Sequence, residues 1–411
     1  MVAHNPQSFA SFVAPARGGA ELVRHDGVDR ILNAVRQHLG MEIAFVSRYV
    51  EGGLKELTHV DSDLDLPMGP GFRDPREDSY CWHIAEGRLP ELIQDTADHP
   101  FTETMAITRF LPVGAHLNTP LRLSDGTLYG SFCCLSRQPD RTMTDRDVGV
   151  LRAFAALAAV QIEAALESDV QAAATRARIE GVLARRDLTV VQQPIHALAT
   201  GLPVGAECLA RFADGASRGP DAWFAEAAQV GMGVDLEMLA IELALASAAA
   251  LPSGCYVSIN ASPDTVLSGR LEAALMASNT ANIVVELTEH QQVADFAALK
   301  AALARIAGRA RIAIDDVGAG YAGLRHLVEL SPHLLKLDIS LVRDIHKDVA
   351  RRALTGAMVR FAAAIGSKLI AEGIECAEEA EVLAELGVDY GQGYHFARPM
   401  RVSDAARYLA A

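Results

Sequence analysis

Carboxylates that directly follow short apolar runs are the residues of this sequence best suited to chemistry. They recur in the second half of the chain, after or close to the runs at 283–285, 312–314, 334–335 and 369–371. A short apolar run bounded by polar residues is typical of a buried strand. An ionisable group at the end of such a strand suits an active site better than a core, because the strands of a parallel barrel end at its catalytic mouth.

Eight polar residues at or near strand ends are expected to converge there, because they are spaced by about one strand–helix unit each. They are Glu207, Asn260, Glu286, Asp315, Asp316, Lys336, Glu372 and Gln392. Carboxylates gathered at one mouth repel one another without a partner, and all-oxygen ligation suits Mg²⁺ or Mn²⁺. The adjacent pair Asp315 and Asp316 could share two ions, a common device for hydrolysing phosphate esters. Any single carboxylate is equally well explained as a surface residue or helix cap, but the whole set is not.

Strand-like runs that alternate with helical segments from about Leu188 onward must position these residues. Helices are predicted at 221–250, 295–307, 348–365 and 377–386. Repeated strand–helix units predict a parallel sheet. About eight strands in roughly 220 residues favour a closed α/β barrel over an open sheet.

The first half of the chain predicts a smaller α+β domain. Helical spacing covers 23–39, and a strand pattern covers 42–50. Two further strands, 118–123 and 128–135, are joined by a turn that contains Asp-Gly, a strong hairpin signal.

A long helix is predicted from Thr144 to about Arg186. Its start resembles a capping box, and an apolar stripe follows without a proline. Such a helix between two domains is well placed to pair with a copy of itself. A plain domain-terminal helix followed by a linker explains the pattern about equally well.

Composition excludes several classes of protein. The net charge of −15 argues against a protein that coats a nucleic-acid polymer. The six cysteines show no zinc spacing, so reduced thiols in the cytoplasm are expected. We expect no membrane span, because no uncharged apolar run approaches the roughly 20 residues that one requires. Residues 1–20 look like a loose tail rather than a signal peptide.

Motifs in the second half, taken in order, resemble the EAL-domain cyclic di-GMP phosphodiesterases. They are QPI at 193, ECLAR at 207, SINASP at 258, ELTE at 286, DDVGAGY at 315, KLD at 336, AEGIE at 371 and QGYHFARP at 392. Each motif alone is weak, whereas all of them in this order are highly specific. The resemblance implies a TIM-like (β/α)8 barrel over residues 187–411 that hydrolyses cyclic di-GMP to linear 5'-pGpG.

The resemblance also implies a ligand set for two Mg²⁺ or Mn²⁺ ions. Glu207, Asn260, Glu286 and Asp315 would bind one ion, and Asp315 with Asp316 would help to hold the second. None of these ligands is missing from the sequence, whereas degenerate, binding-only members of the family usually lose ligands or the base.

Three further residues would act on water and phosphate. Lys336 would orient the nucleophilic water, Glu372 would be the general base, and Gln392 would position water or phosphate. Lys336 beside several acids should stay protonated, so Glu372 is the better base. Gln193 and Arg211 would contact the substrate, although a surface arginine is an alternative for Arg211.

The resemblance also implies two supporting residues, and the sequence differs from the family pattern at two positions. Glu289 would brace the loop that begins at Asp315, and Glu375 would support the site from nearby. Cys208 replaces the middle alanine of the name-giving triplet, and Val317 replaces the usual phenylalanine. The smaller Val317 is expected to affect regulation or rate, because that loop couples substrate, metal and dimer contacts in the family.

Residues 21–166 resemble a GAF domain, a small sensory module, by pattern more than by motif. Its candidate pocket residues are Cys81, Trp82, His83, His116 and Cys133. For each of these a structural role is the stronger interpretation, since thiols in apolar runs are usually core residues. No cofactor can be assigned to this domain.

The leading interpretation is a cytoplasmic enzyme that the GAF domain regulates through a connecting helix at 145–186. It would form a homodimer through the EAL domain and this helix. Two other classes remain open: a receptor that binds cyclic di-GMP without cleaving it, and an enzyme that acts on another phosphodiester such as a linear dinucleotide. A hydrolysis assay beside a binding titration separates them.

Overall fold

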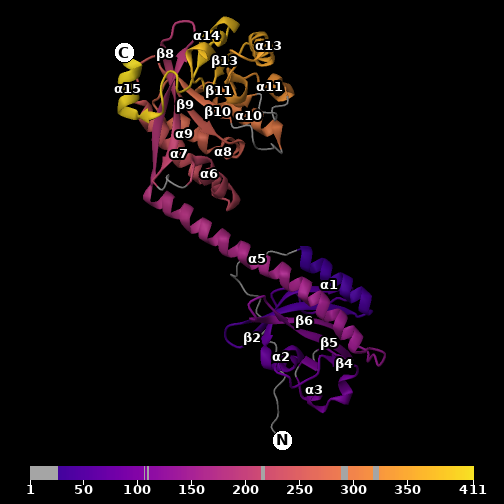
Figure 1. The fold of residues 1–411 in the computed structure, drawn as a ribbon. Helices are drawn as coiled ribbons and strands as arrows, with labels where there is room; N and C mark the ends of the chain where they lie inside the picture. The colour runs from indigo at the N-terminus through magenta and orange to yellow at the C-terminus, as the bar shows by residue number, and fades with distance from the viewer. Residues whose placement is uncertain (1–25, 106, 109–110, 214–217, 288–294, 318–323) are drawn as a thin grey trace. The chain divides into compact units, whose positions relative to one another are not determined.

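The computed structural model describes residues 26–105, 107–108, 111–213, 218–287, 295–317 and 324–411. They form two compact units that divide between Gln171 and Ala172 (Figure 1). The tail expected at 1–20 lies outside the described residues.

The first unit is an antiparallel sheet with helices on its faces. Its strands are β1 Ile43–Val50, β2 Leu54–Ser62, β3 Arg73–Pro75, β4 Leu92–Ile93, β5 Ala115–Arg122 and β6 Leu128–Ser136. Its helices are α1 Asp26–Leu39, α2 Tyr80–Ala85 and α3 Pro100–Thr104, with short 3₁₀ turns at Arg76–Asp78 and Thr96–Asp98. The sheet order is β3-β2-β1-β6-β5-β4. The predicted α+β fold is confirmed.

The predicted hairpin is also confirmed, and it divides the core of this unit in two. Strands β5 and β6 pair antiparallel, with Asn118 opposite Cys133. Because side chains alternate along a strand, Cys134 packs in the core beneath α1, whereas Cys133 packs in the core that includes α2. Two adjacent cysteines therefore occupy opposite faces of one sheet.

A single helix, α5, spans Asp145–Arg185 and confirms the predicted long helix. At its start, the backbone N–H and hydroxyl of Thr144 donate to Asp147 at 2.7 and 3.0 Å. In its first half Leu151 and Ile162 are buried in the core of the first unit, and near its end Ile179 is buried in the second unit. Among the described helices, α5 alone is long and apolar enough to cross a membrane, and its most apolar window is 33% buried. One such helix is weak evidence for a span.

The second unit is a closed barrel of eight strands with helices outside it (Figure 1). Its strands are β7 Leu188–Ala197, β8 Pro203–Phe212, β9 Tyr256–Ala261, β10 Ile283–Leu287, β11 Ala310–Val317, β12 Leu334–Leu337, β13 Lys368–Ala371 and β14 Tyr390–Gly391, with the short β15 Met400–Arg401 beside β7. Strands β8 to β14 are parallel, and β14 pairs with β7 to close the barrel. The predicted TIM-like barrel is confirmed, with one departure: β7 runs antiparallel to both neighbours.

Helices connect the parallel strands on the outside. They are α6 Pro220–Gln229, α7 Gly233–Ala248, α8 Pro263–Leu267, α9 Arg270–Ala277, α10 Phe296–Ile306, α11 Leu324–Leu330, α12 Ile339–Val342, α13 Val349–Ile365, α14 Ala377–Leu386 and α15 Val402–Ala410. The prediction of one helix over 221–250 is wrong. The helix breaks into α6 and α7 because Gly231 adopts a φ of 74°, a left-handed conformation that glycine tolerates.

Candidate active site

An apolar layer inside the barrel forms the floor beneath the polar residues. Its buried members are Ile195, Tyr256, Val284, Ala313, Leu334 and Ile370. Gly205 completes the layer on β8, where a Cβ would lie 2.7 Å from the ring of Tyr256. Because side chains two residues apart on a strand point the same way, the next inward position on each strand lies one layer nearer the mouth.

Those next positions are all polar. They are Gln193, Glu207, Ser258, Glu286, Asp315, Lys336, Glu372 and Gln392. On the reversed strand β7 the step runs towards lower numbers, so Gln193 comes two residues before Ile195 and pairs with Glu207 in register. The structure thus brings seven predicted residues, and Ser258 on β9, into one layer.

Lys336 is the centre of this layer. Its Nζ lies 2.6 Å from Oε1 of Glu372, 2.7 Å from Oε2 of Glu286 and 3.1 Å from Oδ1 of Asp315. A fourth carboxylate, Glu207, is 3.6 Å away. Lys336 is 1% exposed, so its charge is directed entirely at these acids. One ammonium faces four carboxylates.

Amide side chains hold Glu207 on its other side. Nδ2 of Asn260 donates to Oε1 of Glu207 at 3.1 Å, and Nε2 of Gln392 donates to Oε2 at 2.7 Å. The same Nε2 lies 3.1 Å from Oε1 of Gln193, whose own Nε2 donates to the carbonyl of Ala397. Oε1 of Gln392 is buried and has no hydrogen-bond partner among the described residues. That oxygen is free to accept a hydrogen bond from a water or a ligand.

Asp315 and Asp316 lie at the end of β11, as predicted. The backbone N–H of Asp316 donates to Oδ1 of Asp315 at 3.0 Å. Asp316 has a φ of 53°, a conformation that costs a non-glycine residue energy and that gathers at functional sites. Carboxylate oxygens of Asp315, Asp316 and Glu372 lie within 4.8 Å of one another.

The remaining predicted residues lie further from the centre. Nη1 of Arg211 donates to the carbonyl of Ala210 at 2.8 Å, and Arg211 lines the same hollow as Asp316. Glu375 forms an exposed ion pair with Arg343 and lines the same hollow as Glu372 and Lys336. Glu289 lies outside the described residues.

Ser258 belongs to the site although the sequence analysis did not select it. Its hydroxyl donates to Oε1 of Glu286, the oxygen that Lys336 does not contact. Both Ser258 and Glu286 are fully buried. The signal was present in the sequence, since Ser258 precedes Asn260 by two residues and must share its face.

Burial and the neighbouring charges shift the pKa values of the ionisable side chains in this site. Burial raises the pKa of Glu372 to about 8, although Lys336 acts in the opposite direction. Burial also holds the pKa of Glu286 well above its usual range, again against Lys336. For Glu207 burial acts upward, but Lys336 and the amides of Gln392 and Asn260 outweigh it and lower the pKa. Burial alone would lower the pKa of Lys336, and the four carboxylates raise it instead.

The donor set fits a hard divalent cation. It offers carboxylate and amide oxygens from several strands, and a single lysine leaves the acids undercompensated. Such oxygens are the ligands that Mg²⁺ and Mn²⁺ prefer. Two hollows open onto the cluster, one lined by Arg211 and Asp316 and the other by Gln193 and Tyr394. A phosphate-bearing ligand can therefore approach the acids from two sides.

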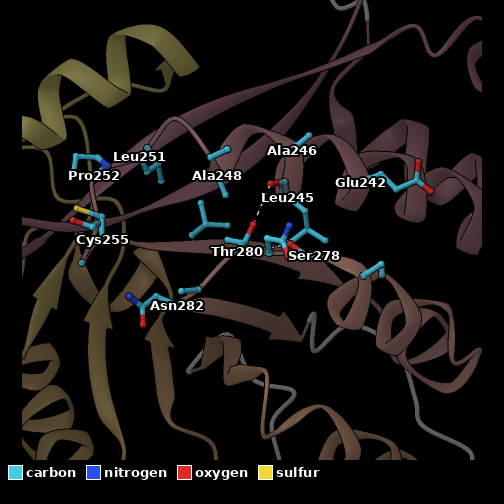
Figure 2. Close-up of a pocket in the computed structure, with 18 residues that line it drawn as sticks. Glu242, Leu245, Ala246, Ala248, Leu251, Pro252, Cys255, Ser278, Thr280 and Asn282 are labelled. Carbon is cyan, nitrogen blue, oxygen red and sulfur yellow. Dashed lines mark hydrogen bonds between the residues drawn. The ribbon is translucent and has the colours of Figure 1, made fainter.

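A different hollow lies at the opposite ends of the strands. Residues that precede β9 and β10, such as Pro252, Cys255, Thr280 and Asn282, line it together with Glu242 (Figure 2). Its lining is mainly alanine, leucine and small polar residues, and Glu242 is its one carboxylate. Among the described residues that line it, no group of convergent acids or bases is present.

An eight-stranded α/β barrel with several carboxylates and one lysine at its mouth is suited to bind divalent cations. Residues 174–399 match the EAL domain family, and residues 24–162 match the GAF domain family. The first match covers more than half of the 411 residues, so the chain belongs to the EAL domain family.

Relatives support the same assignment. A protein of Escherichia coli strain K12 named "Probable cyclic di-GMP phosphodiesterase PdeB" is 32% identical over 248 residues, which are 56% of this chain and 46% of that protein. "Cyclic di-GMP phosphodiesterase PA2567" of Pseudomonas aeruginosa is 33% identical over 166 residues, 39% of this chain and 28% of that protein. The chain thus spans less than half the length of these curated relatives.

A solved structure titled "Structure of EAL Enzyme Bd1971 - cAMP and cyclic-di-GMP bound form" covers 90% of this chain and 93% of its own. Its TM-score is 0.55 at 19% identity. "PaMucR Phosphodiesterase, c-di-GMP complex" covers 56% of this chain and 99% of its own, with a TM-score of 0.50 at 24% identity. At these identities the likeness shows the fold.

Proposed function

We propose that this chain hydrolyses one phosphodiester bond of cyclic di-GMP to give linear 5'-pGpG, with the help of divalent cations. The observation that carries the proposal is the convergence of Glu207, Glu286, Asp315 and Glu372 on the buried ammonium of Lys336. Membership of the EAL domain family and relatives named as cyclic di-GMP phosphodiesterases support the same substrate.

Five residues hold two Mg²⁺ or Mn²⁺ ions in this proposal. Glu207, Asn260, Glu286 and Asp315 hold one ion, and Asp315 and Asp316 help to hold the other. When bound, these ions neutralise charge on the phosphate and make a water molecule more acidic. The strained φ of 53° at Asp316 supports this assignment, because it keeps two adjacent carboxylates at the end of one strand.

Glu372 is the general base. It accepts the proton of the attacking water, and its raised pKa makes it a stronger base than an exposed glutamate. Lys336 stays protonated, orients the water and offsets negative charge on the phosphate. Gln392 positions water or phosphate, a role supported by its unpartnered Oε1.

Substrate contacts come from the two hollows beside the acids. Gln193 and Arg211 line one hollow each, next to Glu207 in both cases. Glu375 supports the rim through its ion pair with Arg343. Glu289 braces the loop after Asp315 in this scheme, although it lies outside the described residues.

Hydrolysis with product identification tests the proposal. The purified full-length chain is incubated with cyclic di-GMP and Mg²⁺ or Mn²⁺. The products are separated by chromatography and identified by mass spectrometry. We expect 5'-pGpG with either cation and no turnover after chelation. Binding of cyclic di-GMP without any turnover would identify a receptor. Faster cleavage of a linear dinucleotide than of cyclic di-GMP would identify a different phosphodiesterase.

Regulation is assigned to the GAF-like region, 21–166, through the helix at 145–186, with the barrel at 187–411. In this proposal the chain forms a homodimer, and the homodimer transmits the regulation. Exposed apolar residues on α5 support it: Leu157 is 57% exposed and Val160 is 61% exposed, three residues apart on one face. Light scattering on the full chain, with Leu157→Glu as the disrupting variant, tests the dimer.

A cytoplasmic location is part of the proposal, and the six free thiols support a reducing compartment.

A further inference from the structure

Three metal-ligating side chains meet inside the GAF domain, away from the acids of the barrel. Cys81 comes from the first turn of α2, His116 from β5 and Cys133 from β6. Alternation along β6 aims Cys133 at the face covered by α2. On β5, Asn118 lies opposite Cys133 and His116 lies two residues away, so all three side chains share that face.

The three ligand atoms form a compact and dry cluster. The sulfurs of Cys81 and Cys133 are 3.1 Å apart, and a nitrogen of His116 lies within 4.8 Å of both. The three residues are 2%, 1% and 0% exposed in chain order. The ring of Tyr80 packs against the imidazole in a tilted arrangement, with centroids 5.1 Å apart and an interplanar angle of 31°.

A second layer of polar groups surrounds the cluster. Nδ2 of Asn118 donates to the sulfur of Cys133 at 2.6 Å, so an amide donor supports this sulfur from outside the cluster. Nδ1 of His116 is buried and has no hydrogen-bond partner in the part of the chain that the structure describes. Donors to ligating atoms are the usual outer support of a metal site.

Ordinary core packing does not account for this arrangement. A thiol–thiol hydrogen bond would account for the 3.1 Å between the two sulfurs, but not for the imidazole and the amide donor that meet them. A disulfide would account for the two sulfurs alone. It would leave the imidazole of His116 without a role and the amide of Asn118 donating to a poor acceptor.

We propose that Cys81, His116 and Cys133 bind one thiophilic divalent cation of the zinc class. Two cysteines and one histidine are a known zinc ligand set, which leaves a fourth position for water or a small ligand. Binding replaces two thiol protons, which pass to solvent, so the thiolates balance the charge of the cation. Cys81 and His116 also line a mainly apolar pocket, so the fourth position can face a small molecule there.

The oxygen ligands of the barrel also bind divalent cations, so the test must detect sulfur ligation. Purified full-length protein is stripped with a chelator and titrated with Co²⁺ as the spectroscopic probe. A sulfur-to-cobalt charge-transfer band in the near ultraviolet arises at a thiolate site and not at an oxygen site. We expect this band at one equivalent and its disappearance when Zn²⁺ is added.

Variants assign the band to these residues. Cys133→Ser and His116→Ala should lose or strongly weaken it. Cys134→Ala is the matched control, because Cys134 is equally buried on the opposite face of the same strand, and it should keep the band. Asn118→Ala should weaken Zn²⁺ binding about 10-fold or more, as loss of outer support does.

Two outcomes would overturn the proposal. One is folded wild-type protein that shows no thiolate band with Co²⁺ and has all six cysteines open to alkylation after denaturation. The other is a protein with two cysteines blocked until a reductant is added and a mass lowered by two hydrogens, which would identify a disulfide. Both are measured on the wild type, so they stand even if a variant fails to fold.

Discussion

Nζ of Lys336 lies 2.6 Å from Oε1 of Glu372, the proposed base. The pair is not an isolated salt bridge, because the same ammonium is 2.7 Å from Glu286 and 3.1 Å from Asp315. One positive charge is divided among several acids. The lysine is therefore the internal counterion of the site, and cations that bind the acids would release Glu372 to act on water.

Removal of that counterion should destabilise the metal-free protein. Lys336→Met leaves buried carboxylates without compensation, a change that typically costs about 3–5 kcal/mol. Urea denaturation in the presence of a chelator measures it. Mn²⁺ should restore more stability to the variant than to the wild type, because the cation takes over the role of the ammonium.

The matched control is Lys347→Met, at a lysine whose ion pair with Asp344 is exposed. It should leave stability nearly unchanged, because exposed ion pairs contribute little. An equal loss for Lys336→Met with and without Mn²⁺ would show that the lysine acts through packing and not through charge.

Glu372→Gln should separate catalysis from binding. The amide keeps the shape of the side chain but cannot accept a proton, so kcat should fall by about 10² to 10⁴. Affinity for cyclic di-GMP, measured by calorimetry on the variant itself, should stay within a few-fold. Glu242→Gln is the control and should retain most activity, because Glu242 pairs with Arg186 and lines the hollow at the opposite ends of the strands. Joint loss of binding and turnover in Glu372→Gln would make Glu372 a ligand-binding or structural residue.

The raised pKa of Glu372 also predicts how stability depends on pH. Burial raises this pKa from 4.5 to about 8, so the folded protein prefers the protonated carboxyl. The resulting stabilisation is fully present below pH 4.5 and is lost as pH rises through about 8. Between these values the metal-free wild type should lose stability relative to Glu372→Gln, which does not titrate.

Thermal denaturation of both proteins in chelator, from acid to alkaline pH, measures this difference. Saturating Mn²⁺ should remove it at neutral and alkaline pH, where the ligands are ionised, because a bound cation favours the ionised carboxylate. A difference between the two proteins that stays constant with pH would argue that Glu372 is ionised throughout in the folded state.

Local patterns made much of the fold predictable. The apolar run before Glu286 and the Asp-Gly turn at Asp125 predict their strands without knowledge of the rest of the chain. The reversed direction of β7 was missed although the sequence shows it: only residues 198–202 separate β7 from β8, too few for the crossover that parallel strands require. The break at Gly231 was visible in the sequence but was outweighed by the apolar helical pattern on both sides.

The acid site of the barrel and the cysteine–histidine cluster of the GAF domain also differ in how far the sequence predicts them. The barrel site was predictable because each acid follows its own apolar run, so the period of the strands places all of them at one mouth. The cluster of Cys81, His116 and Cys133 has no such regularity. It forms only when α2 packs on the sheet and when β5 and β6 pair in their register. The spacing of residues in the sequence predicts neither this packing nor this register.

Ser258 offers the sharpest test of support for the metal ligands. Its hydroxyl donates to Oε1 of Glu286 while Lys336 donates to Oε2, so both oxygens of this fully buried carboxylate are held. Ser258→Ala removes one donor and disfavours the ionised form still further. We expect Mn²⁺ affinity to fall about 10- to 100-fold, as for other residues that orient ligands, with kcat at saturating Mn²⁺ little changed.

Ser262→Ala is the control, since Ser262 follows the same strand but caps α8 through the N–H of Thr265. It should cost about 1 kcal/mol of stability and leave Mn²⁺ affinity intact. Calorimetric titration with Mn²⁺ and turnover at several Mn²⁺ concentrations distinguish the two serines. If Ser258→Ala lowered kcat at every Mn²⁺ concentration and left the affinity unchanged, Glu286 would act on the reaction itself and not as a ligand of the cation.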